Sequence, residues 1–193
     1  MKKKLILSVC AAMAMAFSLP SQAQRLIPKQ RGIEVVGGVP LIKGEKFFGK
    51  DNFGLDISLT RYLKRENYSF VGVEYEQQNM PYRDYGVKLK DALLHLGYMH
   101  PILSDNGKNV FLYAGISALG GYEELNEDKK LLPDGATLLD RSRFVYGGAV
   151  YGSVEVFLTD RLLFLVKAQG RSLFGSDVHR FRPALSTGFR FNI

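Results

Sequence analysis

The sequence of 193 residues contains one cysteine, three histidines and no tryptophan. Cys10 lies in the N-terminal apolar segment, so removal of that segment would leave no disulfide and no thiol chemistry. The histidines do not have the spacing of a zinc site. The glycine-rich pieces lack the Lys-Ser/Thr ending of a phosphate-binding loop. These absences predict no metal, no cofactor and no small-molecule substrate.

Long apolar runs are also missing, except at the N-terminus. Three lysines at positions 2–4 precede the short apolar run Leu5–Leu19, and small residues follow it up to Ala23. This order is typical of a secretory signal peptide, whereas a membrane anchor needs about 18 or more apolar residues. We therefore expect cleavage between Ala23 and Gln24, with residues 1–23 as the signal peptide. Attachment as a lipoprotein through Cys10 is disfavoured, because no small residue precedes it.

The excess of positive charge is small. Loss of residues 1–23 removes three lysines and lowers the formal net charge from +7 to +4, with 23 basic residues against 19 acidic ones. Proteins that bind nucleic acid depend on many phosphate contacts from Lys and Arg. The remaining chain has no run of basic residues. We expect no direct binding of nucleic acid.

What the chain does contain is apolar residues that alternate with small or polar ones. In the clearest segment Phe53, Leu55, Ile57 and Leu59 share one face of a predicted strand. This period of two predicts β-strands, and each is roughly as long as a tilted membrane crossing requires, about 9–11 residues. Without a spanning helix, such a chain crosses a membrane only as a closed barrel. The predicted strands are 32–39, 53–60, 68–77, 87–99, 110–120, 144–157, 162–171 and 181–193.

The connections between these strands also alternate. The turn-like connections are residues 63–67, 101–109 and 158–161, and the longer or more polar ones are 40–52, 79–86, 122–142 and 172–180. Short periplasmic turns and longer outer loops are typical of outer-membrane barrels. We predict an all-β, eight-stranded, antiparallel up-and-down transmembrane barrel over residues 32–193. Both termini lie in the periplasm, and residues 24–31 form a periplasmic extension.

A soluble barrel with an apolar interior is the alternative. The polar face of the strands is rich in Gly, Ser, Ala and Thr, which suits the crowded interior of an eight-stranded barrel. The apolar face is nearly free of charge in mid-strand, as a lipid-facing surface requires. Aromatic residues near the strand ends resemble the girdles of membrane barrels: Tyr62, Tyr68, Tyr98, Phe111, Tyr122, Phe144, Phe157, Phe181 and Phe191. The membrane barrel is therefore favoured.

Charged residues on the inward face are expected to form a network. Barrel closure brings the last strand beside the first, so that Arg190 lies near Glu34, and buried charges need partners. We predict a lumen filled by salt bridges rather than an open pore. The predicted members are Glu34, Asp56, Glu74, Asp91, Glu155, Lys167, Arg171, Arg182 and Arg190.

No catalytic residues are predicted. His95 and Asp91 share the inward face of one strand, and a serine on a neighbouring strand would complete a hydrolase or acyltransferase arrangement. A hydrogen-bonded lumen histidine is the favoured interpretation. The alternation of Phe189, Phe191 and Ile193 resembles the C-terminal assembly signature of outer-membrane barrels, although that signature usually ends in Phe.

Several stretches resemble the TraO family of conjugal transfer proteins, from Bacteroides-type conjugative elements. They are residues 24–34 with Gly37-Gly38, residues 68–75 (YSFVGVEY), residues 95–101 (HLGYMHP) and the turn 157–161. The resemblance implies a part in the DNA-transfer apparatus at the outer membrane and transfers no active-site residues.

Two functions therefore remain open. The first is a non-enzymatic component of a conjugation machine that contacts other proteins of the apparatus through residues 24–31, 40–52 and 122–142. The second is a small general barrel: an adhesin, an envelope-stability protein or, less favoured, a lipid-modifying enzyme.

Overall fold

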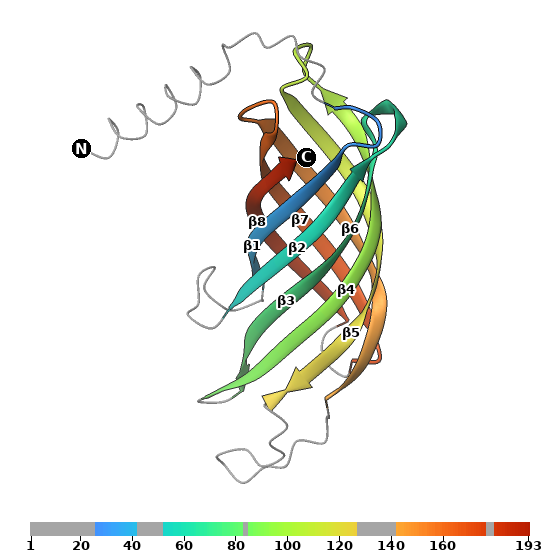
Figure 1. The fold of residues 1–193 in the computed structure, drawn as a ribbon. Helices are drawn as coiled ribbons and strands as arrows, with labels where there is room; N and C mark the ends of the chain where they lie inside the picture. The colour runs from blue at the N-terminus through green and yellow to red at the C-terminus, as the bar shows by residue number, and fades with distance from the viewer. Residues whose placement is uncertain (1–25, 42–51, 83–84, 127–141, 177–179) are drawn as a thin grey trace, which may run out of the picture.

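The computed structural model describes residues 26–41, 52–82, 85–126, 142–176 and 180–193. Eight strands form a closed antiparallel barrel in which each strand pairs with the next and the last pairs with the first (Figure 1). The eight strands of the sequence prediction are confirmed. Their bounds are β1 (Arg31–Pro40), β2 (Phe53–Tyr62), β3 (Tyr68–Tyr82), β4 (Tyr85–Ser104), β5 (Val110–Leu125), β6 (Arg143–Phe157), β7 (Leu162–Phe174) and β8 (Phe181–Asn192).

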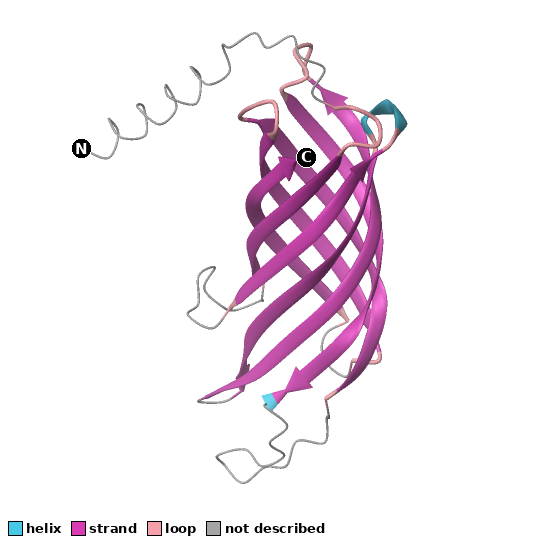
Figure 2. Cartoon of the chain, in the orientation of Figure 1, coloured by secondary structure: helices cyan, strands magenta, loops and turns pink. Residues whose placement is uncertain are grey.

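The two ends of the barrel differ (Figure 2). One end, here the turn end, carries the connections 63–67, 105–109 and 158–161, the first with a 3-10 helix, η1 (Lys64–Glu66). The start of β1 and the end of β8 also lie there, because Gly32 pairs with Asn192. The strand ends that flank residues 41–52, 83–84, 126–142 and 175–180 lie at the opposite end, here the loop end. In the described ranges, no helix is long and apolar enough to cross a membrane.

Five of the seven connections are shorter than predicted, because strands continue past their predicted ends. The predicted loop 79–86 is wrong, because β3 and β4 continue their pairing as far as Tyr82 and Tyr85. The predicted turn 101–109 is also wrong in part, because β4 continues to Ser104 and leaves only residues 105–109 between the strands. The register shifts between Pro101 and Leu103, as expected where proline interrupts a ladder. Polar strand segments extend beyond the apolar band, and alternation cannot detect them.

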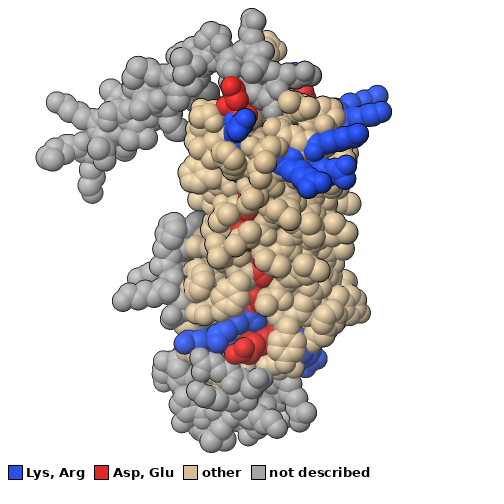
Figure 3. Space-filling view, in the orientation of Figure 1, with Lys and Arg blue, Asp and Glu red and all other residues tan. Residues whose placement is uncertain are grey.

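The two faces of the strands separate as the alternation predicts. Ile33, Leu59 and Ile116 point outward, with 42%, 59% and 64% of their surface exposed, whereas inward-facing Ser58 is buried. On the face of the barrel shown in Figure 3, Lys and Arg gather at the two ends and are almost absent between them. The interior is therefore the polar, crowded side, and the exterior is the apolar one.

The predicted aromatic girdle needs a correction. Tyr98, Tyr122, Phe144, Phe181 and Phe191 are exposed on the outer surface, as predicted. The other four point into the lumen and are buried: Tyr62, Tyr68, Phe111 and Phe157. Aromatic residues at strand ends suit both a lipid interface and a crowded lumen, so residue type alone did not separate the two positions.

Candidate functional site

The turn end of the lumen is closed by aromatic rings. Tyr68 packs edge-on against Tyr62 and Tyr113, with ring centroids 5.5 and 5.1 Å apart. Phe111 stacks on Tyr113 at 5.8 Å and contacts Phe157 at 6.2 Å. Leu26, which precedes β1, packs against this core. The backbone around Leu26 is held by a hydrogen bond from the Lys29 N–H to the Tyr62 carbonyl, at 2.9 Å. The described part of the predicted extension thus folds against the barrel.

A compact ion cluster around Arg190, here the Arg190 cluster, lies next to the aromatic rings on the side of the loop end. The Arg190 guanidinium donates to Glu34 at 2.6 and 2.9 Å and to Glu155 at 2.7 and 3.0 Å. Its carbon lies 4.1 Å from the ring centroid of Tyr68, and the Tyr68 hydroxyl donates to Glu155 at 2.5 Å. Lys167 pairs with Glu34 from β7. Two cations therefore balance two carboxylates in full burial.

A second cluster, here the Arg171–Arg182 cluster, lies nearer the loop end. Arg171 contacts Glu74 at 3.0 Å and Asp91 at 3.3 Å, and it also pairs with Glu76. Arg182 contacts the same Asp91 at 2.7 Å. It also contacts Glu123 at 2.5 Å. Charged hydrogen bonds of this kind are the strong ones in a low-dielectric interior. The cluster connects β3, β4, β5, β7 and β8 across the lumen.

The structure brings together eight of the nine predicted charges in these two clusters and places Asp56 apart. Asp56 accepts a hydrogen bond from Ser58 at 2.5 Å and lies 3.4 Å from His95. Sequence reasoning omitted Glu76 and Glu123 from the network. Glu123 was missed because β5 extends through residues taken for a loop, and continued alternation from Leu119 would have placed it inward.

The group formed by Ser58, His95 and Asp56 does not have the geometry of a catalytic triad. In a triad the acid binds one ring nitrogen of the histidine and the nucleophile binds the other. Here Ser58 and Asp56 both face His95 Nε2, at 3.4 Å each, while buried Nδ1 has no partner. Both Ser58 and His95 are 1% exposed. The arrangement suits a packed lumen and offers no surface to a substrate.

Among the described residues, the free space beside the ion clusters is small. A cavity of about 20 Å³ lies beside Asp56, Glu74 and Lys167, which is room for about one water molecule. No group of three or more His, Cys, Asp or Glu residues within the described ranges has the arrangement of a metal site. The lumen is therefore filled by side chains, as in other eight-stranded barrels.

The sequence of the barrel matches one protein family. The model of the conjugative transposon protein TraO matches residues 27–193. The chain belongs to the TraO family. The match covers all eight strands and the connections between them. A comparison with curated protein sequences finds no match.

Solved structures resemble this TraO-family chain in fold. Neisserial surface protein A has a TM-score of 0.59 at 13% identity, and the match covers 85% of this chain and 97% of that chain. Ail, the attachment invasion locus protein of Yersinia pestis, has a TM-score of 0.55 at 10% identity, with 86% and 100% covered. Identities this low establish the fold alone: a closed, eight-stranded barrel of the outer-membrane type.

Several predicted features of this TraO-family chain lie outside the described residues. They are the signal peptide 1–23, the cleavage site between Ala23 and Gln24, and most of the two loops proposed as contact surfaces, 40–52 and 122–142. The described part of the site is the filled lumen and the strands around it.

Proposed function

We propose that this protein is a non-enzymatic outer-membrane component of a conjugative DNA-transfer apparatus, which acts through contacts with other proteins of that apparatus. The observation that carries the proposal is the family match, since it runs through the whole barrel from residue 27 to the end of the chain. The fold supports the outer membrane, because lipid admits a sheet only as a closed barrel.

The connections support an orientation with the turn end in the periplasm. The three connections at the turn end have four or five residues each, and the start of β1 and the end of β8 lie there too. Three of the four connections at the loop end are longer, and in outer-membrane barrels the short turns face the periplasm. Cleavage between Ala23 and Gln24 would therefore leave the new N-terminus in the periplasm, together with the C-terminus at Ile193. The connections at the loop end would face the outside of the cell.

The filled lumen supports a role through surfaces rather than through transport. The ion clusters and aromatic rings occupy the interior, and the described cavity holds about one water molecule. A nucleic acid strand has no path through such a barrel. The protein surfaces outside the lumen, at the turn end and in the outer connections, are then the places where apparatus proteins bind.

Deletion of the gene followed by a mating assay tests the proposal. The expected result is loss of transfer to the level of a transfer-deficient control, with rescue by the intact gene supplied in trans. The rescued protein should show heat-modifiable gel migration, which reports a folded barrel. Unchanged transfer frequency in the deletion strain would refute the role in conjugation. A loss of adhesion or of envelope integrity with normal transfer would instead support the general small barrel.

A further inference from the structure

A groove of about 500 Å³ opens on the outer surface of the barrel between β2 and β6, toward the loop end. Its floor contains two small residues, Ala92 of β4 and Gly120 of β5. Its other lining residues are apolar or aromatic, such as Tyr75, Leu94, Tyr122 and Phe144, with Glu74 as the one charged residue among them. The groove is therefore a depression in the band that faces lipid, lined almost wholly by carbon.

The strand register explains the depression. Tyr75, Ala92, Tyr122 and Phe144 lie side by side across β3 to β6. The small side chain of Ala92 therefore leaves a gap between Tyr75 and Tyr122. Gly120, which pairs with Leu94 in the next row, has no Cβ to fill the space, although an added Cβ would meet only Phe144, at 3.7 Å. A larger side chain would fit at Gly120, so packing within the chain does not require glycine there.

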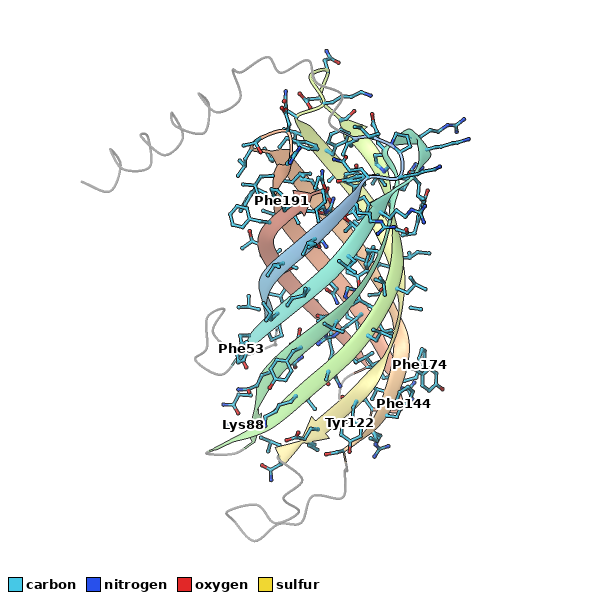
Figure 4. The ribbon with its side chains drawn as sticks, viewed as in Figure 1. Phe53, Lys88, Tyr122, Phe144, Phe174 and Phe191 are labelled. Carbon is cyan, nitrogen blue, oxygen red and sulfur yellow. The ribbon has the colours of Figure 1, made fainter. Side chains whose placement is uncertain are left out.

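Lysines lie where the groove reaches the loop end. Lys90 is two residues from Ala92 on the same face of β4, and it pairs with Glu124 at 3.3 Å. Lys88 lies two residues further along β4 and is exposed at the loop end of the barrel, at the level of Tyr122 (Figure 4). Figure 3 shows basic side chains at this end of the barrel, below the band in which Lys and Arg are almost absent. An apolar depression thus continues into positive charge along one strand.

A phosphorylated lipid has the matching features in the same order, with apolar acyl chains that lead to a negatively charged phosphate. Acyl chains pack by dispersion against carbon surfaces, and an open groove loses those contacts unless a chain fills it. A phosphate at the membrane surface is a suitable partner for lysine. We infer that the groove binds an acyl chain of a phosphorylated lipid whose phosphate contacts Lys88 and Lys90. The inference requires only that the barrel lies in a membrane, and it does not depend on the role in conjugation.

The order of the residues favours lipid over a protein partner. The groove is bounded by the tyrosine, phenylalanine and leucine side chains of a membrane surface, and its charged end lies one row beyond the aromatic residues. Aromatic side chains gather at the headgroup level of a membrane, so lysines close to Tyr122 lie within reach of a lipid phosphate. The Glu124 carboxylate, next to Lys90, repels anions. A free phosphate would therefore bind weakly, whereas the acyl chain of a lipid adds contacts in the groove that offset this repulsion.

The test uses full-length protein purified in detergent and native mass spectrometry with lipid A as the probe. Phosphorylated lipid A should bind, the dephosphorylated form with the same acyl chains should bind more weakly, and inorganic phosphate should not compete. K88Q and K90Q should each weaken binding of the phosphorylated form about fivefold, as one charge at an anionic lipid surface does. G120L should abolish specific binding by filling the groove.

The controls are matched in chemistry. G152L adds the same side chain at another outward glycine, where an added Cβ meets no atom within 4 Å. K64Q removes a lysine at the turn end. Heat-modifiable migration shows that each variant is a folded barrel, and both controls should bind lipid A as the native protein does. Equal binding of the two forms of lipid A, or unchanged binding by folded G120L, would overturn the inference.

Discussion

Replacement of Arg190 by Met should be the most damaging single change in the lumen. The side chain makes charged hydrogen bonds to Glu34 and Glu155 and is 0% exposed. Its loss would leave Glu155 buried with only neutral donors, Tyr68 at 2.5 Å and Ser153 at 3.5 Å. Removal of one partner from a buried ion pair costs about 3–5 kcal/mol of unfolding free energy. That corresponds to roughly two to four orders of magnitude in the folding equilibrium.

A second substitution separates charge from packing. Arg190→Met combined with Glu155→Gln keeps the Lys167–Glu34 pair and leaves the cluster neutral. We expect the double variant to recover most of the loss, to within about 1–2 kcal/mol of the native barrel, because removal of both partners of a buried pair costs far less than removal of one. Arg61→Met, on the exposed surface at the turn end, should change stability by less than about 0.5 kcal/mol.

The measurement is urea unfolding of the purified barrel in detergent, with the folded fraction read from heat-modifiable gel migration. The reasoning is refuted if Arg190→Met costs less than about 1 kcal/mol, the range expected of an exposed ion pair. It is also refuted if the double variant is no more stable than the single one, since the penalty then does not come from unpaired charge.

Three further outcomes follow from the geometry. Gly72→Val should destabilise the barrel by about 1–3 kcal/mol in the same assay, because an added Cβ would lie 2.6 Å from His95 Nε2; Gly152→Val is the matched control. Asp105→Ala should cost about 1 kcal/mol, because the carboxylate accepts backbone hydrogen bonds from Asn109 and Val110 at 2.6 and 2.7 Å. Slight desolvation raises the pKa of Asp105, but these hydrogen bonds outweigh it and hold that pKa below its ordinary value. The stabilisation is therefore complete at neutral pH and disappears only as the pH falls through the lowered pKa. Finally, the native protein in planar bilayers should form no large, stable channels, and such channels would contradict a filled lumen.

The alternation of side chains was enough to predict the strands, because lipid and lumen impose opposite demands on neighbouring residues. It predicted the faces of Glu34 and Arg190 correctly, and it predicted their proximity from closure alone. The strand ends were harder, since polar residues such as Gln78 and Asn79 continue the β3–β4 ladder. Beyond the apolar band, polar residues occur on both faces of a strand, so the change from apolar to polar residues does not mark where the strand ends.

The partners in the network depended on distances that one strand does not reveal. Arg171 of β7 reaches across the lumen to Glu74 and Glu76 of β3 and to Asp91 of β4. Neither β3 nor β4 is next to β7 in the barrel. Sequence predicts which residues point inward, whereas the pairing depends on barrel diameter and tilt. Tyr62 shows that face matters more than residue type, because it lies on the inward face with Ser58 and Thr60.

The Glu34–Arg190 contact joins side chains 156 positions apart, one on the first strand and one on the last. Until the last strand arrives, Glu34 and Glu155 face the forming interior with Lys167 as the one cation of this cluster, so that one of the two carboxylates lacks a counter-charge. A chain that stops before β8 would thus have open edges and unbalanced buried charge together. The ion pair therefore stabilises only the complete barrel in the correct register. Premature closure of a shorter barrel would lack this stabilisation.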